Sequence, residues 1–174
     1  MRIILIILVV MVLLAGCHSP EATQLNYSEG AFECELSWSV GGVNIRGVLS
    51  SEIPKYEDVK RDISLVIAEP KALSGAVVRR LGGIISVDML DIEFKGVDMS
   101  GLLEIERLLG CRGDIIESGV TSLDGERVNR VILKDADGGK KEIYLDSLSG
   151  YPVKICGEVG GDCVEARVIY FSQR

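Results

Sequence analysis

Histidine is almost absent from the 174 residues: His18 is the only one, and aromatic residues make up just 5% of the chain. A serine or cysteine nucleophile needs a neighbouring base, which His18 alone would have to supply. Zinc sites need histidine and cysteine at short spacings, and the five cysteines form no Cys-x-x-Cys pair. We therefore predict that the protein is not an enzyme and that it binds neither a metal nor a cofactor.

Runs of basic residues are also missing. The formal net charge is −7, and the lysines and arginines are scattered along the chain. Nucleic acids and anionic lipid surfaces would repel such a chain, because binding a phosphate surface needs clustered cations. The acidic pairs Asp88/Asp91 and Asp135/Asp137 stand at predicted strand ends and turns, where aspartate is favoured for local hydrogen bonding. The composition therefore predicts no nucleic-acid partner and no catalysis by paired carboxylates.

One uninterrupted apolar run is present at the start of the chain. It extends from Ile3 to Leu14, has its only charge in front of it at Arg2, and ends in Ala15-Gly16 directly before Cys17. A membrane-spanning helix needs about 20 apolar residues, so this run is short for a span. A basic start, an apolar middle and a small-residue cleavage site are typical of a signal peptide, which we place at residues 1–16.

The last residues of this run, Leu14-Ala15-Gly16-Cys17, resemble the lipobox of bacterial lipoproteins. The resemblance implies that the thiol of Cys17 carries diacylglycerol and that the chain is cut before this residue. Two acyl chains anchor a protein stably, which implies a protein held by lipid on the outer side of the cell membrane. An ordinary secretory signal that is cut near an unmodified Cys17 is the alternative.

The rest of the chain divides into a short tether and one domain. Residues 18–30 are polar and show no repeating apolar face, so we predict a tether over residues 17–30, with ordered structure beginning near Ala31. Residues 31–174 have the usual size of a single domain with its own core.

Most of this domain is predicted to be antiparallel β-structure. Residues 32–40 alternate between apolar and polar, and residues 43–50 repeat the pattern after Gly41-Gly42, which predicts a hairpin with a tight turn. A further strand at residues 63–67 ends at Glu69-Pro70. Additional strands are predicted at residues 75–81, 83–87, 90–94, 126–134, 140–146, 151–156 and 164–171.

One segment has helical spacing instead. Apolar residues recur three and four positions apart between Met99 and Leu109, and Gly110 follows as a stop signal, which predicts one helix over residues 99–109. We therefore predict a mainly β fold of the α+β type, with many antiparallel strands and a single inserted helix.

Three stretches resemble the LolA/LolB-like superfamily of lipoprotein and lipid carriers: the hairpin around Gly41-Gly42, "IAEPKALSG" (67–75) and "EIYLDSLSGYPVKI" (142–155). The chain looks most like lipid-anchored relatives from Gram-positive bacteria, including spore-germination lipoproteins. The resemblance implies a curved, incomplete antiparallel barrel whose concave side is plugged by a helix. The chain departs from the carriers in having no long helix before its first strand. An anchor at Cys17 also argues against a shuttling role.

Four cysteines remain after Cys17, and an exported protein can form disulfides. Cys156 and Cys163 both fall on the outer side of their strands, so we predict a Cys156–Cys163 bond across a hairpin. Cys34 faces inward and Cys111 follows the predicted helix, so a Cys34–Cys111 bond would pin the helix across the sheet. The alternative for the second pair is two reduced thiols that act as small apolar side chains.

The remaining candidate site is apolar. A curved sheet of this kind does not fill its own interior, so the plug helix is expected to leave a cleft for an acyl chain. In the simpler interpretation the same residues form the core. The predicted cleft residues are Phe32, Leu36, Trp38, Val40, Ile45, Leu65, Ile67, Leu102, Leu103 and Leu109.

Two functions follow from these expectations. In the first, the membrane-anchored half-barrel binds a lipid or an acyl group in the cleft. In the second, the cleft is filled and the protein is an interaction module for an envelope partner such as a cell-wall or germination enzyme.

Overall fold

The computed structural model describes residues 25–40, 42–53, 61–96, 100–159 and 162–174. The predicted signal peptide and Cys17 lie outside these residues, so cleavage and lipid attachment stay predictions. Within the described ranges, no helix has the length and apolar character that a membrane crossing requires.

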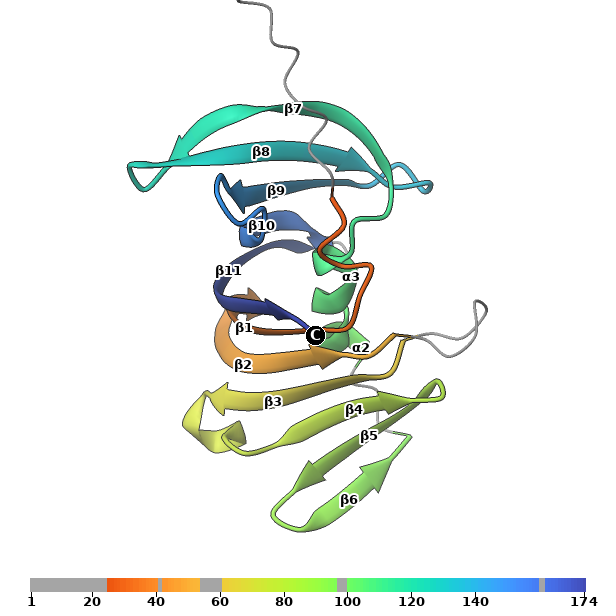
Figure 1. Ribbon diagram of the computed structural model, residues 1–174. Coiled ribbons are helices and arrows are strands. Elements are labelled where there is room, and N and C mark those ends of the chain that lie inside the picture. Colours follow the sequence, from red (N-terminus) through yellow and green to blue (C-terminus); the bar gives the residue numbers. More distant parts are fainter. Residues whose placement is uncertain (1–24, 41, 54–60, 97–99, 160–161) are drawn as a thin grey trace, which may run out of the picture.

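The described residues form one eleven-stranded antiparallel sheet in the order β6-β5-β4-β3-β2-β1-β11-β10-β9-β8-β7 (Figure 1). The strands are β1 Phe32–Val40, β2 Val43–Ser51, β3 Ile63–Glu69, β4 Val77–Leu81, β5 Ile84–Met89, β6 Ile92–Lys95, β7 Asp114–Leu123, β8 Glu126–Lys134, β9 Lys140–Asp146, β10 Pro152–Val159 and β11 Asp162–Gln173. A 3₁₀ turn at Lys71–Leu73 follows β3. The predicted β1–β2 hairpin is confirmed, with Val40 paired to Val43 across the turn.

The order of the strands explains why helices lie on the concave side. β6 and β7 are consecutive in the sequence but form opposite edges of the sheet, so the chain between them must cross it. That crossing contains α2 (Ser100–Leu103) and α3 (Ile105–Leu109), which lie across the middle strands in Figure 1. The open half-barrel with a plugged concave side, as implied by the LolA/LolB-like resemblance, is confirmed as the fold.

The plug differs from the single helix predicted over residues 99–109. It consists of two short helices that are interrupted at Glu104, and Met99 lies outside the described residues. Leu103 and Ile105 are both buried. Both belong to the buried core cluster, although the backbone at Glu104 keeps helical dihedral angles (φ −62°, ψ −20°).

β7 was not predicted from the sequence. It is an edge strand whose residues are exposed on both faces over most of its length. A strand with no buried face has no reason to alternate between apolar and polar residues, which removes the usual sequence signal.

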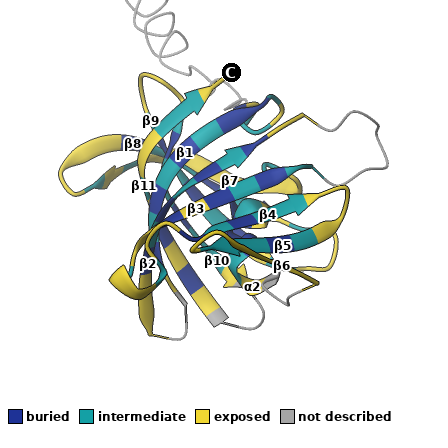
Figure 2. Cartoon of the chain, turned by 90° about the horizontal axis from the view of Figure 1, so that it is seen from below, coloured by how far each residue is buried: buried dark blue, intermediate teal, exposed yellow. Residues whose placement is uncertain are grey.

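The core lies between the middle strands and the helices. Figure 2 shows the buried residues concentrated on the central strands and the exposed ones towards the ends of the sheet. Part of the predicted tether belongs to this core: Tyr27 is only 2% exposed, and its ring meets Phe171 edge to face at 5.5 Å. The packed part of the chain therefore begins before Ala31, because an aromatic ring in an otherwise polar segment finds an apolar site.

Candidate functional site

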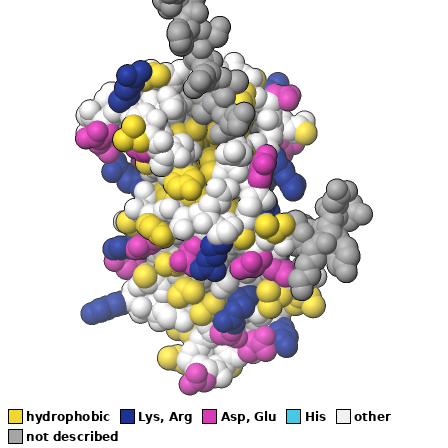
Figure 3. Space-filling view, in the orientation of Figure 1, with side chains coloured by type: hydrophobic (Ala, Val, Ile, Leu, Met, Phe, Trp, Pro, Cys, Tyr) yellow, Lys and Arg dark blue, Asp and Glu magenta, His cyan; other side chains and the backbone are white. Residues whose placement is uncertain are grey.

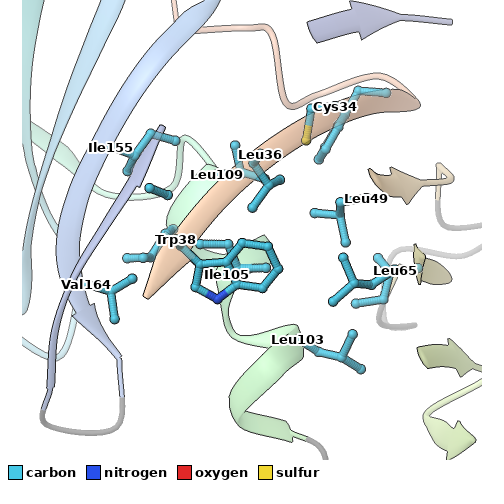
Figure 4. Packing of buried hydrophobic residues seen from close by; sticks show 14 of the residues in the cluster. Cys34, Leu36, Trp38, Leu49, Leu65, Leu103, Ile105, Leu109, Ile155 and Val164 are labelled. Carbon is cyan, nitrogen blue, oxygen red and sulfur yellow. The ribbon is translucent and has the colours of Figure 1, made fainter. Parts of the chain in front are cut away.

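The predicted cleft residues come together as core on the concave side. Leu102 is partly exposed at the edge of this cluster, and the side chain of Val40 lies outside the described residues. Figure 4 shows Trp38 in the middle of this cluster, overlapping Ile105 in the view, with Leu36 and Leu109 above the ring and Leu103 below it. The buried members are Phe32, Leu36, Trp38, Ile45, Leu65, Ile67, Leu103 and Leu109. The space between the central strands and the helices is thus filled by protein side chains.

The structure contains neither predicted disulfide, and all four described cysteines are free thiols. Cys156 lies opposite Glu165, and Cys163 lies opposite Glu158. The two cysteines share the convex face but are displaced by two residues along the hairpin. Diagonal neighbours of this kind lie roughly 7–8 Å apart, beyond the distance that a disulfide bridges. The prediction assumed a longer turn, and the observed Val159–Asp162 pairing gives a different register.

Cys34 and Cys111 both lie near Tyr27, a neighbour that the sequence pattern did not indicate. Burial raises the pKa of the Cys34 thiol to about 12, and the adjacent Glu33 carboxylate adds to the shift. Burial also raises the pKa of Tyr27 well above its ordinary value, with a further contribution from Cys111. Tyr27 and Cys34 are therefore neutral at physiological pH. Cys34 acts as the small apolar side chain of the alternative interpretation.

The C-terminal end of α3 is held by a buried lysine on β9. Lys141 Nζ donates hydrogen bonds to the carbonyl oxygens of Gly110 at 2.6 Å and Arg107 at 3.4 Å, and it lies 3.7 Å from Asp135 Oδ1. A cation at this end of a helix satisfies carbonyl groups that have no partner within the helix. Close by, a Cβ atom on Gly157 would lie 2.6 Å from Leu108 Cδ2, so this glycine permits the contact between β10 and α3.

A second polar contact holds α3 to the other half of the sheet. Arg80 on β4 pairs with Glu106 at 3.2 Å, and both side chains are largely buried. Arg80 also donates to the carbonyl oxygen of Arg61. The backbone N–H of Cys111, just after α3, donates to Ser28 Oγ at 3.0 Å. The plug is thus tied to β4, to β9 and to the segment that precedes β1.

Replacing Lys141 with methionine tests the first of these contacts. Because the carbonyl groups at the end of α3 lose their donor, we expect the free energy of unfolding at pH 7 to fall by about 1–3 kcal/mol. Burial lowers the pKa of Lys141 in the folded state. The unfolded state therefore binds more protons between that pKa and the ordinary value of 10.5, so stability from this group rises with pH in that window.

The free energy of unfolding of the wild type should therefore exceed that of Lys141→Met by a margin that grows between pH 7 and pH 10. Urea denaturation followed by Trp38 fluorescence measures this difference. The other titrating groups are common to both chains and cancel in the difference. An advantage that shrinks with rising pH would contradict the proposed burial of this charge.

A groove of about 760 Å³ runs along the solvent side of the plug. Phe32, Leu103, Cys111 and Ala136 provide its apolar surface, and most of the remaining lining is charged, with six cations and five carboxylates. We call this cavity the charged groove. Figure 3 shows positive and negative side chains next to each other on this face of the molecule, with apolar side chains between them. Its volume is within the range of small-molecule sites.

An uncovered apolar surface lies on the outer strands of the concave side. Val87 pairs with Phe94 and Met89 with Ile92, so the four side chains share one face. Val87 and Met89 pack against the core, which identifies this face as the concave one. Phe94 is nevertheless 49% exposed and Ile92 56% exposed. We call this surface, completed by Ile85, the β5–β6 concave face.

Neither feature could be recognised in the sequence. The lining of the charged groove comes from residues between Ser28 and Lys141 that are scattered in sequence, and no spacing connects them. The alternation in residues 90–94 did predict a strand, but it could not show that the helices stop short of covering it. Among the described residues, no group of three or more histidine, cysteine or acidic side chains is placed to hold a metal ion.

The sequence matches no protein-family model and no curated protein. Solved structures do resemble the fold. MucB aligns with a TM-score of 0.52 and 11% identity over 86% of this chain and 55% of MucB, so the chain spans little more than half of that protein. An uncharacterized conserved protein from Thermus thermophilus aligns with a TM-score of 0.50 and 9% identity over 86% of this chain and 83% of that one.

A LolA superfamily protein from Nitrosomonas europaea aligns with a TM-score of 0.41 and 11% identity, over 88% of this chain and 90% of that one. At identities this low, structural similarity is evidence for the fold alone.

Proposed function

We propose that this protein is an exported lipoprotein, held at the outer side of the cell membrane by lipid on Cys17, that binds a lipid or acyl group on the concave side of its LolA-like half-barrel. The β5–β6 concave face supports the proposal best. Exposed apolar side chains that continue directly from a core are typical of ligand or partner surfaces. The filled space around Trp38 moves the site that we propose from the centre of the sheet to this outer face.

The size of the contact is consistent with a weak to moderate ligand site. Phe94 and Ile92 each leave about half of their surface in water. Covering half of such a side chain is worth roughly 1–1.5 kcal/mol, so several together favour an acyl chain by a few kcal/mol. Binding at this face needs no displacement of α2 or α3.

Replacing Phe94 with aspartate tests the proposal. Native mass spectrometry of the full chain, released from detergent in the presence of 1-palmitoylglycerol, should show the bound lipid. We expect Phe94→Asp to bind this lipid about tenfold more weakly than the wild type does. The matched control is Ile84→Asp on the neighbouring strand. Ile84 is also exposed, but it pairs with Leu81 on the convex face, so binding should be unchanged.

Equal binding by both variants and the wild type would exclude this face as the site. Absence of bound lipid from all three chains would reject the binding function itself.

The filled core favours a second candidate, in which the same fold is an interaction module for an envelope protein. The long edge strand β7, which is exposed on both faces, offers unpaired backbone groups for such a partner. Crosslinking in the native membrane should then recover one defined protein attached through β7. Crosslinked products that contain lipid but no protein would favour the first candidate.

A further inference from the structure

The charged groove begins where the β5–β6 concave face ends. Arg80, which lines the groove, lies directly opposite Ile85 of that face in the β4–β5 ladder. On the plug, Leu103 lines the groove, while the preceding Leu102 packs at the edge of the core. An apolar surface and a charged cavity are therefore adjacent, which is the arrangement that a ligand with an apolar tail and a polar head requires.

Most charges in the groove already neutralise each other. Glu104 lies 3.4 Å from Arg107 and Glu106 lies 3.2 Å from Arg80. A third carboxylate, that of Asp135, is 3.7 Å from Lys141. These pairs hold the plug and its surroundings in place, so their charges are not free for a ligand.

Three cations of the groove form no ion pair with a described residue: Arg61, Arg112 and Lys134. Arg61 donates to the carbonyl oxygens of Gly30 and Glu29, which orients the guanidinium without neutralising it. Arginine stays protonated at all physiological pH values. Two carboxylates of the groove, Asp114 and Asp137, likewise form no ion pair with a described residue, and Asp114 lies opposite Lys134 in the β7–β8 ladder, so the unpaired side chains carry a net charge of +1.

We propose that the ligand is a phospholipid-type amphiphile whose phosphate headgroup lies in the charged groove near Arg61, Arg112 and Lys134, with its acyl chain on the β5–β6 concave face. This inference rests on the proposed apolar site and adds the chemistry of the headgroup. The chain as a whole carries a net charge of −7, which repels free anions. A small phosphate compound without a tail therefore lacks the apolar contacts that must provide most of the binding energy.

The position of the groove relative to the membrane fits a lipid ligand. Ser28 lines the groove and stands eleven positions after Cys17. A fully extended chain of that length spans at most about 40 Å. A protein anchored at Cys17 thus keeps this groove within reach of the lipid headgroups.

The experiment compares three probes on the full chain by native mass spectrometry: 1-palmitoyl lysophosphatidylglycerol, 1-palmitoylglycerol and glycerol 3-phosphate. We expect the phosphate-bearing lipid to bind about tenfold more tightly than the neutral lipid with the same tail. The double variant Arg112→Gln/Lys134→Gln should lose this preference while keeping its affinity for the neutral lipid. Arg127→Gln, an exposed arginine on β8 that does not line the groove, is the matched control and should keep the preference.

Each other outcome has a defined meaning. Equal affinity for the two lipids, or a preference that survives the double variant, overturns the headgroup assignment and leaves the apolar site intact. If glycerol 3-phosphate binds as tightly as the phosphate-bearing lipid, the proposal of a lipid ligand is rejected and the groove is a simple anion site. Failure of both lipids to bind rejects the proposed function together with this inference.

Discussion

Replacement of Trp38 with alanine should lower the free energy of unfolding by about 3–5 kcal/mol, because it removes the largest side chain from the middle of the core. Trp38 is 3% exposed and lies opposite Ile45 on β2 and Ala166 on β11. Its ring belongs to the same buried cluster as Ile105 of the plug (Figure 4). The loss would therefore loosen both halves of the sheet and the helices at the same time. The chain has a single tryptophan, so far-UV circular dichroism during urea denaturation is the suitable measurement.

Tyr170→Ala is the matched control for this experiment. Tyr170 is a large aromatic residue on β11, one of the strands that pair with β1, but it is 55% exposed. We expect its removal to change stability by about 0.5 kcal/mol or less. Similar losses for the two variants would mean that the concave centre is not the close-packed region of the molecule.

Gly47→Ala should have the second-largest effect, a loss of about 3 kcal/mol at most. A Cβ atom at this position would lie 2.6 Å from the backbone oxygen of Val66 and 3.1 Å from Leu65 Cδ1. A side chain can rotate away from such a contact, but the oxygen of Val66 is part of the neighbouring strand. β2 and β3 would have to separate locally. Trp38 fluorescence during urea denaturation measures this change.

Gly119→Ala separates this clash from the general effect of replacing a strand glycine. Gly119 lies in β7, and a Cβ atom there would meet no neighbouring atom within 4 Å. Alanine at such a position reduces the freedom of the unfolded chain, so stability should stay equal or rise by about 0.5 kcal/mol. A comparable loss of unfolding free energy in both variants would show that the contact with Val66 does not cause the destabilisation of Gly47→Ala.

Strands with one buried face were predictable because burial leaves a period of two in the sequence. β1 is the clearest case: Cys34, Leu36 and Trp38 are buried in the structure, as their alternation indicated. The same reasoning failed for β7, which has no buried face. It also failed for the plug, because helical spacing alone did not reveal that the helix is interrupted at Glu104 with Leu103 and Ile105 both buried.

The predicted Cys156–Cys163 bond is absent from the structure for a related reason. The alternation of residues correctly placed Cys156 and Cys163 on one face, but a bond also depends on the register between the two strands. In the structure Val159 pairs with Asp162, which places Cys156 opposite Glu165 and Cys163 opposite Glu158. A displacement of two residues keeps both cysteines on the convex face and still separates their thiols beyond bonding distance.

By itself, the sequence determined the mainly β character and the apolar residues of the concave core, because these depend on local periodicity, while the half-barrel was implied by the resemblance to the LolA/LolB-like superfamily. Only the tertiary structure decided that the centre is filled, that the outer concave face is open, and that scattered cations gather in one groove. Those properties arise from contacts between residues far apart in the chain. One groove is lined by Arg61, Arg112 and Lys134 only because the connection from β6 to β7 has to cross the sheet.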